Sequence, residues 1–246
     1  LRHLCYNSPQ FMVTLSDIER ARETLSGIAT RTPLLMDRKL SDGAAEIYVK
    51  AECLQRAGSF KIRGAYVRIA RLSDDERAKG VVAASAGNHA QGVALAASML
   101  DTKTTVFMPE GAPIVKEKAT RAYGADVRFV GATVDEALVA AKAFAAETGA
   151  VLIHPFDHPD IVAGQATVGL EIIEQCPDVR TIVVSVGGGG LLAGIAVAVK
   201  DARPDVRLVG VQAIGAAAYP PSLDAGRPVP LETMTTMADG IAVACP

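Results

Sequence analysis

Short apolar runs alternate with longer segments of helical period along the chain from about residue 46. The apolar runs predict strands at residues 46–52, 81–84, 104–108, 126–130, 151–154, 181–186 and 207–211. Each run is short and mostly apolar, which is typical of strands that are covered on both faces. Strands that alternate with helices form βαβ units, so the pattern predicts an α/β fold with a mostly parallel sheet.

The segments between these strands predict helices at residues 88–100, 113–123 and 133–148. The last is rich in alanine and is followed by Gly149, which suits the end of a helix. Near the start of the chain, Ser16 and Glu19 have the spacing of a capping box, which predicts a further helix there. Residues 1–11 contain no apolar segment long enough for a signal peptide or a membrane span, and we expect a loose tail.

The composition is that of a globular protein that binds a small molecule. The chain has 246 residues, of which 50% are hydrophobic and 21% charged, enough for one large core or two modest ones. Its 25 Lys and Arg residues nearly balance 27 Asp and Glu residues, and no long run of one sign suggests nucleic acid or an anionic membrane as partner. The four cysteines, Cys5, Cys53, Cys176 and Cys245, are too far apart for a disulfide framework or a metal motif, so we expect thiols in a reducing cytosol.

Lys61 is the first candidate for chemistry. It follows Ser59 and Phe60 and precedes a segment of moderate helical amphipathicity, so it is expected at a junction between a loop and a helix. A lysine that is partly removed from water there loses its proton more easily, and its neutral amine attacks an aldehyde. By itself, one lysine after one phenylalanine is more often a solvated surface residue.

The segment from Ser85 to Gly92 reads Ser-Ala-Gly-Asn-His-Ala-Gln-Gly and lies between a predicted strand and a predicted helix. Short hydrogen-bond donors and backbone amides at the start of a helix form a site for a carboxylate or a phosphate. The alternative is an ordinary turn capped by Ser85 or Asn88, and His89 alone could be a structural histidine.

Four consecutive glycines, Gly187 to Gly190, follow the predicted strand at 181–186 and precede a helix expected to begin near Leu191. Glycines let the backbone approach an anion closely, and the helix dipole adds a favourable potential, so the run predicts a phosphate site. The run lacks the glycine spacing of a dinucleotide fold and the lysine of a nucleotide P-loop, which disfavours NAD and ATP. A flexible turn is the alternative.

In full, the first segment reads Gly-Ser-Phe-Lys-Ile-Arg-Gly-Ala at 58–65, and the third reads Gly-Gly-Gly-Gly-Leu-Leu-Ala-Gly at 187–194. Together and in this order, the three segments resemble the fold-type II enzymes that use pyridoxal 5'-phosphate, and among them most closely the threonine and serine dehydratases. The resemblance runs from about Leu15 to the last residue and includes the Met-Pro pair at 108–109, the Gly-Ala pair at 124–125 and the Ala-Asp-Gly-Ile sequence at 238–241. It implies two open, twisted α/β domains of the tryptophan-synthase-β kind.

The resemblance also implies a role for each matching residue. Lys61 would bind the cofactor covalently and act as the catalytic base. The remaining cofactor contacts would come from Phe60, Asn88, Gly187, Gly188, Gly189, Gly190, Leu191 and Gly240. The substrate carboxylate would be received by Ser85, Asn88, His89 and Gln91.

The activity implied by the resemblance is the dehydration and deamination of L-threonine to 2-oxobutanoate and ammonia, and of L-serine to pyruvate. Such an enzyme would be a cytoplasmic lyase of amino-acid metabolism, with a place in isoleucine biosynthesis, and a homo-oligomer. Its partner would be a small amino acid, with no nucleic acid and no membrane. Two alternatives stay open: another fold-type II elimination or replacement enzyme, or a truncated chain that binds the cofactor without turnover.

Three departures from the family pattern matter. Serine racemases have a second serine where this chain has Ala86, so racemisation is disfavoured. The racemases bind a divalent metal through carboxylates in a stretch that corresponds to Gln212 through Ala218, and this stretch has no carboxylate, so we expect no metal. The dehydratases place a small polar residue against the pyridine nitrogen well downstream of the Ala-Asp-Gly sequence, whereas this chain ends at Pro246, so we expect the C-terminal part of the fold to be missing.

The resemblance also suggests how the chain divides into domains. Residues 1–70 and 158–246 would form a large cofactor-binding domain, incomplete at its C-terminus, and residues 71–157 a small mobile domain. The small domain would carry the turn that begins at Ser85, and its closure would exclude water from the site.

Overall fold

The computed structural model describes residues 13–41, 43 and 45–246, so the tail expected at residues 1–11 and Cys5 lie outside the described residues. The helices are α1 Leu15–Thr24, α2 Lys61–Ala70, α3 Asp74–Lys79, α4 Asn88–Met99, α5 Ile114–Ala122, α6 Val134–Thr148, α7 Pro159–Gln175, α8 Gly190–Ala202 and α9 Tyr219–Ala225. The strands are β1 Leu34–Met36, β2 Tyr48–Lys50, β3 Val81–Ala84, β4 Thr104–Met108, β5 Asp126–Phe129, β6 Val151–Leu152, β7 Thr181–Ser185 and β8 Arg207–Val211. Short 3-10 turns occur at Glu52–Leu54, Arg56–Gly58, Ile214–Ala216 and Asp239–Ile241.

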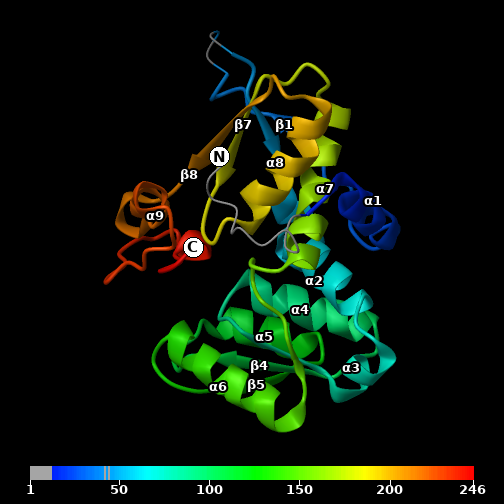
Figure 1. The fold of residues 1–246 in the computed structure, drawn as a ribbon, viewed down its shortest axis with the longest axis vertical. Helices are drawn as coiled ribbons and strands as arrows, with labels where there is room; N and C mark the ends of the chain where they lie inside the picture. The colour runs from blue at the N-terminus through cyan, green and yellow to red at the C-terminus, as the bar shows by residue number, and fades with distance from the viewer. Residues whose placement is uncertain (1–12, 42, 44) are drawn as a thin grey trace.

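A four-stranded parallel sheet, in the order β5-β4-β3-β6, forms the middle layer of the lower half of the molecule in Figure 1. Along β3, Val81 and Ala83 pack against α2 and α4, whereas Val82 and Ala84 pack against α6. Successive strand residues point to opposite faces, so a strand with helices on both sides becomes apolar throughout. The predicted parallel sheet is confirmed, and β3 and β4 are covered on both faces, whereas the edge strand β5 is largely exposed.

A second parallel sheet, made of β7 and β8, lies in the upper half of Figure 1. Ile182 and Val184 face a core formed with α7 and α8, but Val183 on the other face is 64% exposed. The prediction that every strand is covered on both faces is therefore wrong for β7, because its two helices pack on one face only. The short antiparallel pair β1 and β2 is also largely exposed.

Helix α1 begins earlier than the sequence suggested. The hydroxyl of Thr14 accepts a hydrogen bond from the Asp17 amide at 3.3 Å, and the Asp17 carboxylate accepts one from the Thr14 amide at 2.9 Å. This capping box replaces the one predicted from Ser16 and Glu19, and the Ser16 hydroxyl instead accepts a hydrogen bond from Arg20 at 2.7 Å. Helix α6 ends as predicted at Gly149, which has a φ of 75°.

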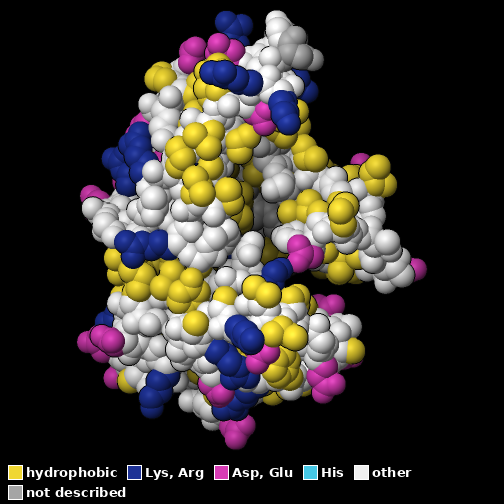
Figure 2. All heavy atoms as spheres, turned by 180° about the vertical axis from the view of Figure 1, so that it is seen from behind, with side chains coloured by type: hydrophobic (Ala, Val, Ile, Leu, Met, Phe, Trp, Pro, Cys, Tyr) yellow, Lys and Arg dark blue, Asp and Glu magenta, His cyan; other side chains and the backbone are white. Residues whose placement is uncertain are grey.

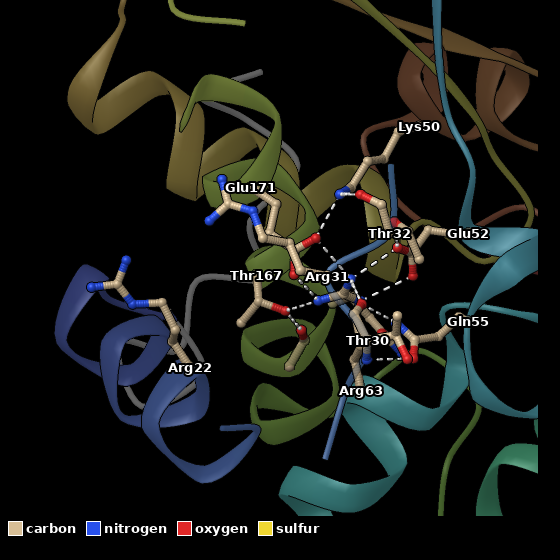
Figure 3. Close-up of polar contacts among 12 residues, drawn as sticks. Arg22, Thr30, Arg31, Thr32, Lys50, Glu52, Gln55, Arg63, Thr167 and Glu171 are labelled. Carbon is tan, nitrogen blue, oxygen red and sulfur yellow. Dashed lines mark hydrogen bonds and ion pairs between the residues drawn. The ribbon is translucent and has the colours of Figure 1, made fainter. Parts of the chain in front are cut away.

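Helix α2 is fixed to its surroundings by a buried ionic network, shown in Figure 3. The side chain of Arg63 is 1% exposed and contacts the carboxylates of Glu52 and Glu171 at 2.8 and 2.6 Å. Lys50 reaches the second oxygen of Glu171 at 2.6 Å. A buried guanidinium is stable only when such partners satisfy it, so the network holds the start of α2 against α7 and the segment after β2.

Candidate functional site

The site begins with Lys61, the first residue of α2. Its amine donates a hydrogen bond to the carbonyl oxygen of Pro155 at 2.7 Å and lies 5.3 Å from the centre of the Phe60 ring. Burial lowers the pKa of this amine from its ordinary value of 10.5 to about 8. Near neutral pH a usable fraction of the amine is therefore uncharged, as the sequence predicted for a lysine that attacks an aldehyde.

Helix α4 approaches Lys61 so closely that a side chain at Gly92 would be crowded. A Cβ atom added to Gly92 would lie 3.0 Å from the backbone carbon and from the Cβ of Lys61. One turn earlier, His89 is buried, and its Nε2 lies 2.8 Å from the carbonyl oxygen of Ile153. Burial, with the nearby Lys61, lowers the pKa of His89 to about 3, so the imidazole is neutral.

The turn before α4 presents hydrogen-bond donors at the end of β3. Ser85 follows the strand directly, and its hydroxyl accepts a hydrogen bond from the Gly87 amide at 3.0 Å. Gly87 is the N-cap of α4, and no side chain caps this helix end. Asn88 is exposed and Gln91 is partly buried. Ser85 therefore caps the turn itself, as the alternative expected, but no side chain caps α4, and the first amides of the helix stay available for an anion.

The four glycines form the turn between β7 and α8. Gly189 has a φ of 92° and is the N-cap of α8, again without a side-chain cap. The amide groups of residues 187–192 donate to no acceptor within the described part of the chain. Successive unpaired amides at a helix start fit a phosphate, as the sequence predicted.

The segment after β6 connects the lysine to the glycine turn. The carbonyl oxygen of Pro155 accepts the hydrogen bond of Lys61. The ring of the next residue, Phe156, fills the space beside Gly188, where a Cβ atom added to Gly188 would lie 2.2 Å from the ring. Phe60 and Leu191 pack into one apolar cluster between the same two regions. Lys61 and the glycine turn therefore contact two neighbouring residues of one segment, Pro155 and Phe156.

The segment around Gly240 completes this region. Ile241 lies 3.2 Å from the position of a Cβ on Gly187, which places the neighbouring Gly240 beside the glycine turn. Asp239 forms an ion pair of 2.7 Å with Lys116 of α5, and this contact lowers the pKa of Asp239. Figure 2 shows a hollow between the upper half, the lower half and the lobe on the side of α9 and the C-terminus.

The sequence analysis assigned no role in the site to four residues of this region: Pro155, Phe156, Gln212 and Tyr219. A signal was available for the first two. Strands β3 and β6 are parallel neighbours, so the loops after them meet at the same edge of the sheet, where ligands bind in open α/β folds. Nothing local in the sequence marked Gln212 or Tyr219 as neighbours of the glycines.

Comparison with known proteins gives the family. Residues 25–246 match the family model described as pyridoxal-phosphate dependent enzyme. The chain belongs to this family. Its cofactor is therefore pyridoxal phosphate, and the described residues fit it, with an amine of lowered pKa at one end of the region and unpaired amides at the other.

Members of this pyridoxal-phosphate family with known activities are similar over most of the chain. L-threonine ammonia-lyase of Thermotoga maritima is 51% identical over 96% of the chain, and the chain spans 59% of that enzyme. The processed form of threonine deaminase isoform 2 from Solanum lycopersicum superimposes with a TM-score of 0.88 at 40% identity, covering 96% of this chain and 67% of that one. Maize serine racemase superimposes with a TM-score of 0.90 at 36% identity, covering 94% and 70%. These matches confirm the predicted fold-type II α/β architecture.

No helix in the described residues is both long and apolar enough to cross a membrane.

Proposed function

We propose that the protein dehydrates and deaminates L-threonine, and also L-serine, with pyridoxal phosphate as cofactor. The observation that carries this proposal is the position of Lys61, whose amine of lowered pKa lies between two helix starts without side-chain caps. Relatives named threonine ammonia-lyase or threonine dehydratase support the substrate. The chain spans 59% of the length of the first two of these relatives, so their activity is a proposal for this protein.

Different residues would hold the two ends of the cofactor. Lys61 would bind the aldehyde, with Phe60 beside the ring, and Asn88 would contact the ring hydroxyl. Gly187 to Gly190 and the amide of Leu191 would hold the phosphate, and the backbone of Gly240 would line the ring pocket. When bound, pyridoxal phosphate supplies an aldehyde that links to amines and a ring that withdraws electrons from the substrate α-carbon.

The start of α4 would receive the substrate carboxylate. Ser85, Asn88 and Gln91 would contribute side chains, and the helix dipole favours a negative charge at this end. The His89 ring is already engaged with Ile153, so His89 would contribute through its backbone amide.

The Lys61 amine would move the protons of the reaction. In its neutral form it would remove the proton from the substrate α-carbon, and the hydroxyl group then leaves the β-carbon as water. Hydrolysis of the resulting enamine returns that water and releases ammonia, so threonine gives 2-oxobutanoate. A base with a pKa near the working pH combines a sizeable neutral fraction with useful proton affinity.

We also propose that residues 71–157 form a small mobile domain that closes on a large domain of residues 1–70 and 158–246. The lower body in Figure 1, which contains α3 to α6, supports this division, and the ion pair between Lys116 and Asp239 would link the two domains. Structures with and without bound substrate test it, because superimposable forms would contradict closure. The resemblance also favours a cytoplasmic homo-oligomer, and light scattering of the purified protein tests the assembly.

The main test measures both cofactor and product. Purified protein loaded with pyridoxal phosphate should show an absorbance band near the visible edge that Lys61→Ala abolishes. Threonine should then give a 2-oxo acid without added sulfide. An unaltered band in Lys61→Ala would refute the cofactor site, and cysteine formation from O-acetylserine without 2-oxo acid would refute the dehydratase.

Serine racemisation is the second candidate, because maize serine racemase has a TM-score of 0.90. The residue that argues against it is Ala86, which has no proton to exchange on the opposite face of the substrate. Chiral analysis after incubation with L-serine separates the two: pyruvate without D-serine supports the dehydratase. Release of D-serine as the main product would establish the racemase.

A further inference from the structure

Two side chains outside the three sequence motifs form hydrogen bonds to the glycine turn. Gln212 lies just after β8, and Tyr219 is the first residue of α9. The side-chain amide of Gln212 donates a hydrogen bond of 3.3 Å to the carbonyl oxygen of Val186, the residue before the glycines. The hydroxyl of Tyr219 donates one of 3.2 Å to the carbonyl oxygen of Gly188.

These two side chains also support each other. The Tyr219 amide donates to the Gln212 side-chain oxygen at 2.9 Å, so the strand end, the turn and α9 form one connected unit. The Tyr219 hydroxyl also occupies the space beside Gly189, where an added Cβ would lie only 1.7 Å away. Burial raises the pKa of Tyr219, which keeps the hydroxyl protonated as a donor.

Peptide geometry gives these contacts a consequence for the opposite side of the turn. In a planar trans peptide the carbonyl of one residue and the N–H of the next point in opposite directions. Because the Val186 and Gly188 carbonyls point toward Gln212 and Tyr219, the amides of Gly187 and Gly189 point away from them. Those amides belong to the group that donates to no acceptor in the described residues.

We propose that Gln212 and Tyr219 are positioning residues that orient the glycine amides toward the cofactor phosphate. Without them, glycines have wide conformational freedom, and the amides would lose their common direction. The proposal rests on the proposed role of Gly187 to Gly190 in holding the phosphate. It predicts that the two side chains act on the phosphate end of the cofactor and leave the aldehyde end unaffected.

The test compares the affinity for pyridoxal phosphate with that for pyridoxal, which lacks the phosphate. Tyr219→Phe keeps the ring and removes one hydrogen bond, so affinity for pyridoxal phosphate should fall about 3- to 10-fold. Combined with Gln212→Leu, the loss should reach about 10- to 100-fold. Affinity for pyridoxal should change by less than about 2-fold in both variants. Both affinities are measured from the Lys61-dependent absorbance band in cofactor-free protein titrated with each compound.

Controls make each outcome decisive. Tyr123→Phe removes a hydroxyl at the end of α5 and should leave both affinities unchanged. Urea unfolding confirms that Tyr219→Phe is folded, and this conservative variant alone suffices if the double variant does not fold. Equal losses for the two compounds, or no loss for either, would overturn the proposal. Absence of a Lys61-dependent band in the wild type would instead refute the proposed function.

Discussion

The lowered pKa of Lys61 makes a prediction about stability that needs no catalysis. Removing the charge of this amine with Lys61→Met should change how the stability of the cofactor-free protein depends on pH. The amine has a pKa of about 8 in the folded chain and about 10.4 in the unfolded chain. This difference corresponds to about 3 kcal/mol, by which the folded state disfavours the protonated amine.

The sign of this pH dependence follows from the proton that the chain takes up when it unfolds. Below pH 8 both states carry the proton, and the folded wild type bears the full cost of burying the charge. Between pH 8 and about 10.4 the folded chain has released its proton while the unfolded chain keeps it, so unfolding takes up a proton. The free energy of unfolding of the wild type should therefore rise by about 1.4 kcal/mol per pH unit relative to the variant. Methionine also loses the hydrogen bond to Pro155, but that loss shifts the whole curve and leaves its slope unchanged.

Urea unfolding of both proteins at intervals from pH 7 to 10 measures the slope. Other groups titrate in this range, but both proteins share them, so they cancel in the difference. The exposed Lys118→Met on α5 is the control for loss of a surface lysine. Parallel curves for the wild type and Lys61→Met would show that the amine is not desolvated, which would refute the reasoning about its reactivity.

Three further predictions follow from the packing around the site. Gly92→Ala should destabilise the protein by about 1–3 kcal/mol in urea, because its Cβ would press on Lys61, whereas Ser98→Ala on the exposed side of α4 should have little effect. Arg63→Met should lower the free energy of unfolding by about 3–5 kcal/mol, because it removes the ion pair of the partly buried Glu52 and leaves Glu171 with Lys50 alone. Arg121→Met breaks an exposed pair and should lower it by less than about 1 kcal/mol; similar losses would contradict the role of burial. His89 has a folded pKa of about 3, so the wild type should lose stability relative to His89→Gln as pH falls from about 6.5 toward 3; matching acid-unfolding curves would count against a neutral buried imidazole.

The site residues predicted from the sequence lie in one region of the fold, but the structure changes how some of them are understood. His89 was expected to receive a carboxylate, and its ring is instead held by a backbone carbonyl. Gly92 was noted only as the last residue of the segment that begins at Ser85. In the structure, its lack of a side chain lets α4 pack closely against Lys61. Arg63 belongs to the same motif as the lysine, and its buried partners give it a structural role that spacing alone did not suggest.

The sequence by itself determined most of the strands and the three motifs, but it did not predict β1, α3, α7 or α9. Strands β3, β4 and β8 have the predicted bounds, because apolar periodicity and turn residues act over a few neighbouring positions. Only the tertiary structure decided which distant groups meet. Lys61 bonds to Pro155, 94 residues later, and Arg63 to Glu171, 108 residues later. It also placed Tyr219 against Gly188. Such contacts depend on how whole layers pack, and a local pattern carries no information about the distance between two segments that are far apart in the chain.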